Sequence, residues 1–134
     1  MKQSIFLVFS MLFSLGLFAQ TKSVEEIVQA NLDAYNSRDI ETFMLFIDEN
    51  IEFYNAGECE PYLKGKSEVR KRYISYFEKS PNLHSEIKNR MVFGNKVIDY
   101  EYITGANGNT EPFELIFMYE VMGDKIIKTT AIRK

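Results

Sequence analysis

The chain has 134 residues, the size of one domain. Its formal net charge is −3, and a mildly acidic chain lacks the basic surface that nucleic-acid binding requires. Cys59 is the single cysteine, so no internal disulfide can form and the fold depends on its apolar core; the thiol is either free or paired between chains.

The N-terminal segment has the pattern of a secretory signal peptide. Lys2 gives it a positive start, residues 5–18 are apolar except for two serines and one glycine, and Ala19 precedes Gln20. The apolar run is shorter than the roughly 20 residues of a membrane-spanning helix. We expect residues 1–19 to be cleaved, leaving residues 20–134 as one periplasmic or secreted domain without a stable membrane anchor. The alternative is an uncleaved anchor.

Two amphipathic helices are predicted at the start of this domain. Ser23 and Glu26 form a capping box, and the apolar stripe that follows extends to Tyr35. Asp39 is a candidate N-cap for a second, shorter helix, whose apolar positions extend to Ile47. The polar residues after Ile47 are expected to end this helix.

A short strand and a third helix follow. Ile51 and Phe53 alternate with polar neighbours, as in a strand, and the loop after them contains Pro61. Ser67 is expected to cap the third helix, and Pro81 follows its end.

The remainder of the chain reads as an antiparallel meander. The turn residues Gly94 and Asn95 predict a hairpin between its first two strands. Three amphipathic helices and a sheet with one apolar face are best buried as helices on one side of a curved sheet. We therefore predict an α+β cone that encloses a cavity. The expected strands are 83–93, 96–104, 113–121 and 125–132.

The order and spacing of several segments resemble the nuclear transport factor 2-like superfamily, of the SnoaL-like kind. The resemblance implies three N-terminal helices packed on a curved, mostly antiparallel sheet, with a pocket between them. It also implies a homodimer through the outer face of the sheet. Members include ketosteroid isomerase, scytalone dehydratase, limonene epoxide hydrolase, polyketide cyclases and proteins that only bind. The segments are 32–39, Phe43, Phe46, Asp48, 51–54, Gly65, Val69, Arg70, Tyr73, 94–101, 119–121 and 123–126.

The chain departs from the catalytic patterns of those enzymes. The position of the isomerase base falls on Tyr54 or Asn55, and that of the tyrosine in its first helix falls on Asn31. The strand 99–101 lacks the Arg-x-Asp of the epoxide hydrolase, and Tyr100 stands where similar relatives carry histidine. The catalytic residues of the isomerase and of the epoxide hydrolase are therefore not expected in this chain.

Asp99 and Glu101 are the candidate catalytic residues. They lie two apart on a predicted strand and so share one face. If they face a dry cavity, their repulsion raises one pKa toward a value useful for proton transfer. In the alternative, Val97, Asp99, Glu101 and Ile103 form the outer face of the sheet, and the alternation alone favours this orientation.

A second set of residues is expected to contact a ligand. His84 is the sole histidine and is either a base or a solvated side chain, and Arg90 is either the partner of a pocket carboxylate or an exposed charge. One histidine and one cysteine far apart predict no metal site, and no phosphate loop or cofactor motif is present. The candidate ligand-binding residues are Asn31, Tyr35, Tyr54, Tyr73, His84 and Tyr119.

Three functions are compatible with these features. The first is binding of a small apolar or aromatic molecule in the cone pocket. The second is an isomerase-like or cyclase-like enzyme, in which Asp99 or Glu101 transfers a proton and a tyrosine donates a hydrogen bond. The third is a dimeric protein-binding module, which would have a filled core. The sequence does not decide whether the protein is an enzyme.

Overall fold

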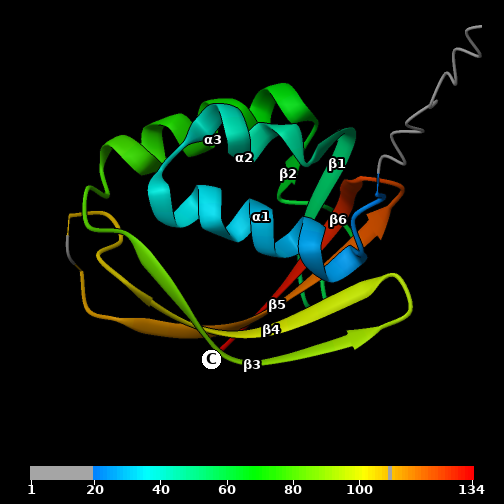
Figure 1. Ribbon diagram of the computed structural model, residues 1–134. Helices are drawn as coiled ribbons and strands as arrows, with labels where there is room; N and C mark the ends of the chain where they lie inside the picture. Colours follow the sequence, from blue (N-terminus) through cyan, green and yellow to red (C-terminus); the bar gives the residue numbers. More distant parts are fainter. Residues whose placement is uncertain (1–19, 109) are drawn as a thin grey trace, which may run out of the picture.

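A computed structural model describes residues 20–108 and 110–134. The predicted signal peptide, residues 1–19, lies outside the described residues. In the described part, three helices cover one side of a curved six-stranded sheet (Figure 1). None of the described helices is long and apolar enough to cross a membrane. The predicted α+β architecture is confirmed.

The first two helices begin where the sequence predicted. Helix α1 (Val24–Ser37) has the capping box, in which Ser23 Oγ accepts from the Glu26 amide and the Glu26 carboxylate accepts from the Ser23 amide. Helix α2 (Ile40–Leu45) begins after Asp39, whose carboxylate accepts a bond from the Thr42 amide.

Two helix boundaries differ from the prediction by more than one residue. Helix α2 ends at Leu45, and Ile47 begins strand β1 (Ile47–Asn55), where it pairs with Ile126. Helix α3 (Lys66–Glu78) starts after Gly65, and no side chain caps it, so the expected Ser67 cap is wrong. Gly65 has a φ of 87°, which glycine adopts at little cost, and this turn directs the chain into the helix.

The sheet has the order β2-β1-β6-β5-β4-β3. Strands β3 (His84–Phe93), β4 (Lys96–Thr104), β5 (Phe113–Met122) and β6 (Lys125–Arg133) form the predicted antiparallel meander. Strand β1 pairs with β6 in parallel, and the short strand β2 (Leu63–Lys64) pairs with the outer edge of β1. The sheet thus continues past the meander into β1 and β2, the two strands that precede α3 in the chain.

An irregularity in β3 decides which of its side chains face the helices. The β3–β4 register shifts by one residue between Ile87 and Asn89. Residues directly opposite each other in an antiparallel pair share a face, so Arg90 points to the same side as Asp99, and Ser85 to the same side as Ile103. Without the extra residue, Ser85 would face outward.

Candidate functional site

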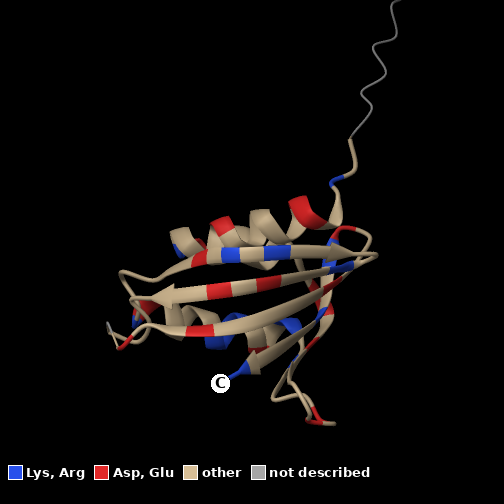
Figure 2. Ribbon diagram, turned by 90° about the horizontal axis from the view of Figure 1, so that it is seen from below, with Lys and Arg blue, Asp and Glu red and all other residues tan. Residues whose placement is uncertain are grey.

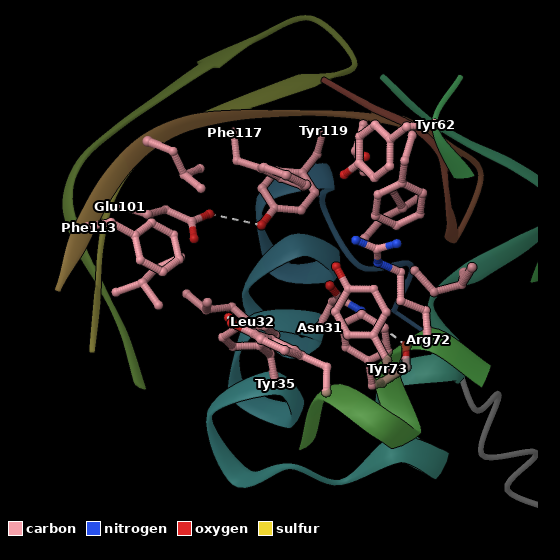
Figure 3. A pocket seen from close by; sticks show the side chains of 18 of the residues that line it. Asn31, Leu32, Tyr35, Tyr62, Arg72, Tyr73, Glu101, Phe113, Phe117 and Tyr119 are labelled. Atoms are coloured by element: carbon pink, nitrogen blue, oxygen red, sulfur yellow. Dashed lines mark hydrogen bonds between the residues drawn. The ribbon is translucent and has the colours of Figure 1, made fainter. Parts of the chain in front are cut away.

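A cavity of about 420 Å³ lies between the helices and the concave face of the sheet (Figure 3). Its wall is mostly aromatic and aliphatic, which suits an apolar molecule. Helix α3 packs on the end of the sheet formed by β1 and β2, and α1 packs on β3, β4 and β6, so the wall includes residues of both layers (Figure 1). Representative lining residues are Phe43, Phe53, Tyr62, Phe113, Leu115 and Phe117.

Glu101 is the one acidic residue in the cavity lining. Its side chain is 4% exposed, and its two carboxylate oxygens accept hydrogen bonds from the Tyr119 hydroxyl at 3.0 Å and from Ser85 Oγ at 2.8 Å. Burial raises the pKa of Glu101 to about 7, although both hydrogen bonds favour the ionised form. The carboxyl group therefore changes its protonation state near neutral pH.

Asp99 has a different environment, although it points to the same side of the sheet. It is fully buried and forms two hydrogen bonds of 2.7 Å with the Arg90 guanidinium, whose third nitrogen donates to Gln29 of α1 at 2.8 Å. Asp99 does not line the cavity. Its pairing with Arg90 fastens the sheet to α1 and leaves Glu101 as the candidate acid or base.

The orientation favoured by the alternation of β4 is therefore wrong. Asp99 and Glu101 are both buried on the side of the helices, and Tyr100 lies on the opposite face, where its hydroxyl donates to Glu114 at 2.7 Å. Both carboxylates can be buried because each has partners on neighbouring elements. The alternative of an exposed Arg90 is also wrong, since its side chain is 13% exposed and pairs with Asp99.

Tyrosine hydroxyl groups supply further polar atoms to the wall. Tyr35 and Tyr76 share a hydrogen bond of 3.1 Å, and Tyr73 packs with Phe43 in a stacked pair with ring centroids 4.5 Å apart. Burial is the main cause that raises the pKa of Tyr35, Tyr73 and Tyr119 above its ordinary value, so all three stay protonated at neutral pH. They can donate hydrogen bonds to a ligand or hold its rings.

Thr129 on β6 contributes a hydroxyl with no partner. It is 2% exposed and lines the cavity, and its Oγ1 is the one buried side-chain polar atom without a hydrogen bond among the described residues. It lies directly across from Tyr119 in the β5–β6 register. Because an unpaired buried hydroxyl is unfavourable, this atom marks a place for a polar ligand atom or a water molecule.

Four of the six predicted ligand-binding residues line the cavity: Asn31, Tyr35, Tyr73 and Tyr119. Tyr54 and His84 do not. The Tyr54 hydroxyl donates to Glu52 at 2.7 Å and Lys128 lies over its ring, while His84 is exposed at the start of β3. Adjacent residues of a strand point to opposite faces of the sheet. Phe53 faces the cavity, so its neighbour Tyr54 faces away from it.

The sequence reasoning missed several lining residues. Leu115 and Phe117 could have been found, because they share a face with the predicted Tyr119 by simple alternation. Tyr62 lies in a segment read as loop, and Ser85 reaches Glu101 only because of the bulge in β3, for which the sequence has no signal. Cys59 is free and exposed. The described residues contain no cluster of three potential metal ligands.

Comparison with known proteins places this fold in a family. The model of the SnoaL-like domain matches residues 28–129. A cystatin-fold protein from Novosphingobium aromaticivorans is 27% identical, with a TM-score of 0.77, over 84% of this chain and 99% of its own. An NTF2-like protein of unknown function from Cytophaga hutchinsonii is 13% identical, with a TM-score of 0.72, over 87% and 94% of the two chains.

A third similar structure is of a protein that was co-crystallised with a small molecule. TerC, co-crystallised with polyporic acid, is 11% identical, with a TM-score of 0.66, over 83% of this chain and 91% of its own. No curated protein matches the sequence. The matched region extends from α1 to β6 and includes every cavity-lining residue except Arg133, and the predicted resemblance is confirmed. The chain belongs to the SnoaL-like domain family, with the nuclear transport factor 2-like fold.

Proposed function

We propose that the protein binds a small apolar or aromatic molecule in the cavity between the helices and the sheet. The carrying observation is an aromatic-walled cavity of about 420 Å³ that ends in a few polar groups, the arrangement typical of small-molecule sites. A protein-binding module without a ligand would fill this space with side chains. TerC, a protein of the same fold, was co-crystallised with polyporic acid, which is in keeping with a ligand here.

The polar end of the cavity defines what such a molecule carries. Glu101, Tyr119 and Thr129 offer both donors and acceptors, because Glu101 exchanges its proton near pH 7 and the Thr129 hydroxyl has no partner. A hydroxyl or carbonyl group on an otherwise apolar ligand would satisfy them. A purely hydrocarbon ligand would leave Thr129 unpaired and is the weaker candidate.

Thermal unfolding of the purified protein with steroids, polyketide-like aromatics and terpenoids tests the proposal. A ligand at about 100 times its dissociation constant stabilises the native state by roughly 2.7 kcal/mol. We expect at least one class to raise the melting temperature. Thr129→Val should lower the affinity for the ligand that responds about fivefold or more, because the variant loses one hydrogen bond. Thr130→Val, on the next residue, is the control and should not. No response from any class, or equal effects of the two variants, would count against binding.

The second candidate function is a proton-transfer enzyme with Glu101 as acid or base. A carboxyl group with a pKa of about 7 that lines a cavity favours it, because general acid–base catalysis works best when the pKa lies near the operating pH. Asp99 has no part in this candidate, since Arg90 occupies both of its oxygens. A bound ligand with an acidic C–H bond should exchange that hydrogen in D2O, followed by NMR, and Glu101→Gln should stop the exchange. Exchange at the same rate in the variant would dismiss this function.

We also propose that the protein meets its ligand outside the cytoplasm. The support is the signal-peptide pattern of residues 1–19. Mass spectrometry of protein recovered from the periplasm or the medium should give an N-terminus at Gln20. An intact Met1 in protein found only inside the cell would refute export.

A further inference from the structure

The charges at the mouth of the cavity are all positive. Of the lining residues, Arg72, Lys79, Asn107 and Arg133 are exposed and therefore form its rim, whereas Glu101 lies at the buried end. Figure 3 shows the Arg72 guanidinium beside Tyr62 on the side of the cavity opposite Glu101. The rim thus has three cations and no carboxylate.

These three cations have no acidic partners. Within the described chain, eleven ion pairs involve other lysines and arginines, and neither Arg72, Lys79 nor Arg133 takes part in one. Such pairing is common elsewhere on α3, where Arg70 pairs with Glu41 and Lys71 with Glu68. Unpaired cations around one opening attract an anion.

Two of the cations converge on a single aromatic residue. The Arg72 guanidinium lies 5.8 Å from the centre of the Tyr62 ring, a cation–π contact. Burial raises the pKa of Tyr62, and the charges of Arg133 and Arg72 oppose that rise, which places both guanidinium groups near this phenol. Arg72 comes from α3 and Arg133 from the end of β6, so the two arginines approach the mouth from the two layers. Guanidinium groups suit planar oxyanions because they donate two parallel hydrogen bonds.

Building on the proposed ligand binding, we propose that the ligand is an amphipathic organic carboxylate. Its carboxylate lies between Arg72 and Arg133, its apolar or aromatic body fills the middle of the cavity, and a hydroxyl or carbonyl group at its far end meets Glu101. The rim then supplies charge complementarity, and the buried end supplies hydrogen bonds. A neutral molecule of the same shape would leave the rim charges unused.

Calorimetric titration with a matched pair of probes tests this inference. The probes are 4′-hydroxybiphenyl-4-carboxylate and the neutral 4′-hydroxybiphenyl-4-carboxamide. We expect the carboxylate to bind about tenfold more tightly, as one charge-assisted interaction provides. The double variant Arg72→Gln/Arg133→Gln should remove this preference, so that the two probes bind with equal affinity. Added salt should weaken the binding of the carboxylate probe but not that of the carboxamide, because salt screens the exposed charges of the rim.

Lys71→Gln is the matched control. Lys71 is exposed on the same helix, pairs with Glu68 and does not line the cavity, so its removal changes net charge without changing the rim. It should retain the tenfold preference. Equal binding of the two probes to the wild type, or the same preference in the double variant as in Lys71→Gln, overturns the anion inference while ligand binding stands. Failure of both probes to bind at 1 mM, while a neutral compound of the thermal panel binds, also overturns the anion inference alone. Failure of the probes and of every class in that panel overturns the proposed function as well.

Discussion

Glu101 couples the stability of the protein to pH. Because burial raises its pKa from 4.5 to about 7, the folded state holds a proton that the unfolded state releases between these two values. The stability that this group provides is complete below pH 4.5 and is lost as the pH rises through 7. Each pH unit in that window costs about 1.4 kcal/mol, so the loss approaches about 3 kcal/mol.

Glu101→Gln should abolish this dependence. Glutamine keeps an oxygen for the Tyr119 hydroxyl and does not ionise. The free energy of unfolding of the variant should therefore rise relative to that of the wild type by about 2.5 kcal/mol between pH 5 and pH 8. Urea unfolding of both proteins at several pH values measures this difference, because ionisation effects that the two proteins share cancel in the comparison. A difference that stays constant over this range would show that Glu101 titrates at its ordinary pKa.

The two neighbouring carboxylates show how local partners decide their roles. Asp99 lies opposite Arg90 in the β3–β4 register, and the hairpin turn at Gly94 and Asn95 is enough to predict that pairing. Glu101 lies beyond the β3 bulge, where Ser85 and Tyr119 replace an arginine with two hydroxyl groups. Uncharged partners leave the desolvation of Glu101 uncompensated, which is why its pKa rises while Asp99 remains a structural ion-pair partner.

At the scale of elements, the meander was predictable and its surroundings were not. The β4 bounds agree with the prediction because Gly94 and Gly105 flank a strand of strict alternation. The parallel pairing of β1 with β6 joins segments more than 70 residues apart, and alternation within one strand contains no information about such a partner. The same limit applies to Ile47, whose apolar side chain fits a helix stripe and a buried strand equally well. The cavity could be predicted from the curvature of the sheet. Its rim could not, because Arg72 of α3 and Arg133 of β6 come together only through the packing of helix and sheet.

Gly105 directly follows β4, and its backbone packs closely against the loop that precedes β3. It has a φ of 69°, and an added Cβ atom would lie 2.1 Å from the backbone oxygen of Asn82. Gly105→Ala should therefore destabilise the fold by about 2–4 kcal/mol, from left-handed strain and from displacement of the neighbouring backbone. Urea unfolding measures this loss.

Gly123→Ala is the matched control for this substitution. Gly123 has a φ of 61° in the β5–β6 hairpin, with nothing within 4 Å of an added Cβ atom. Gly123→Ala should therefore lower the free energy of unfolding only by the cost of the left-handed backbone, about 1 kcal/mol. Equal losses in the two variants would mean that the backbone at Asn82 moves aside freely, and that this loop does not hold the cavity end of β4 in place.

At the scale of the whole molecule, the outer face of the sheet is apolar enough to pair with a second copy. In the view from below, most of the length of β3, β4 and β5 is uncharged, although short charged segments interrupt each strand (Figure 2). The registers align Met91, Ile98 and Met118 in one row, and Tyr100, Ile116 and Ile132 in the next. Met91, Ile116 and Ile132 are 55%, 37% and 47% exposed, which is unusual for a contiguous apolar surface that stays in water.

We propose a homodimer in which this face packs against the same face of a second copy, as the family resemblance implies. A two-fold axis places identical rows against each other, so one surface is enough to form the interface. Ile116→Lys puts a charge at its centre and should raise the dissociation constant of the dimer about 100-fold or more, because an unpaired buried charge costs at least 3 kcal/mol. Ile74→Lys is the control: Ile74 is also 37% exposed but lies on α3, in the helical layer. Sedimentation equilibrium separates the outcomes, since a wild-type monomer, or dimers of equal strength in both variants, would rule out this interface. The cavity opens at the rim formed by α3 and β6, so a dimer through the outer face would leave both mouths free to bind ligand.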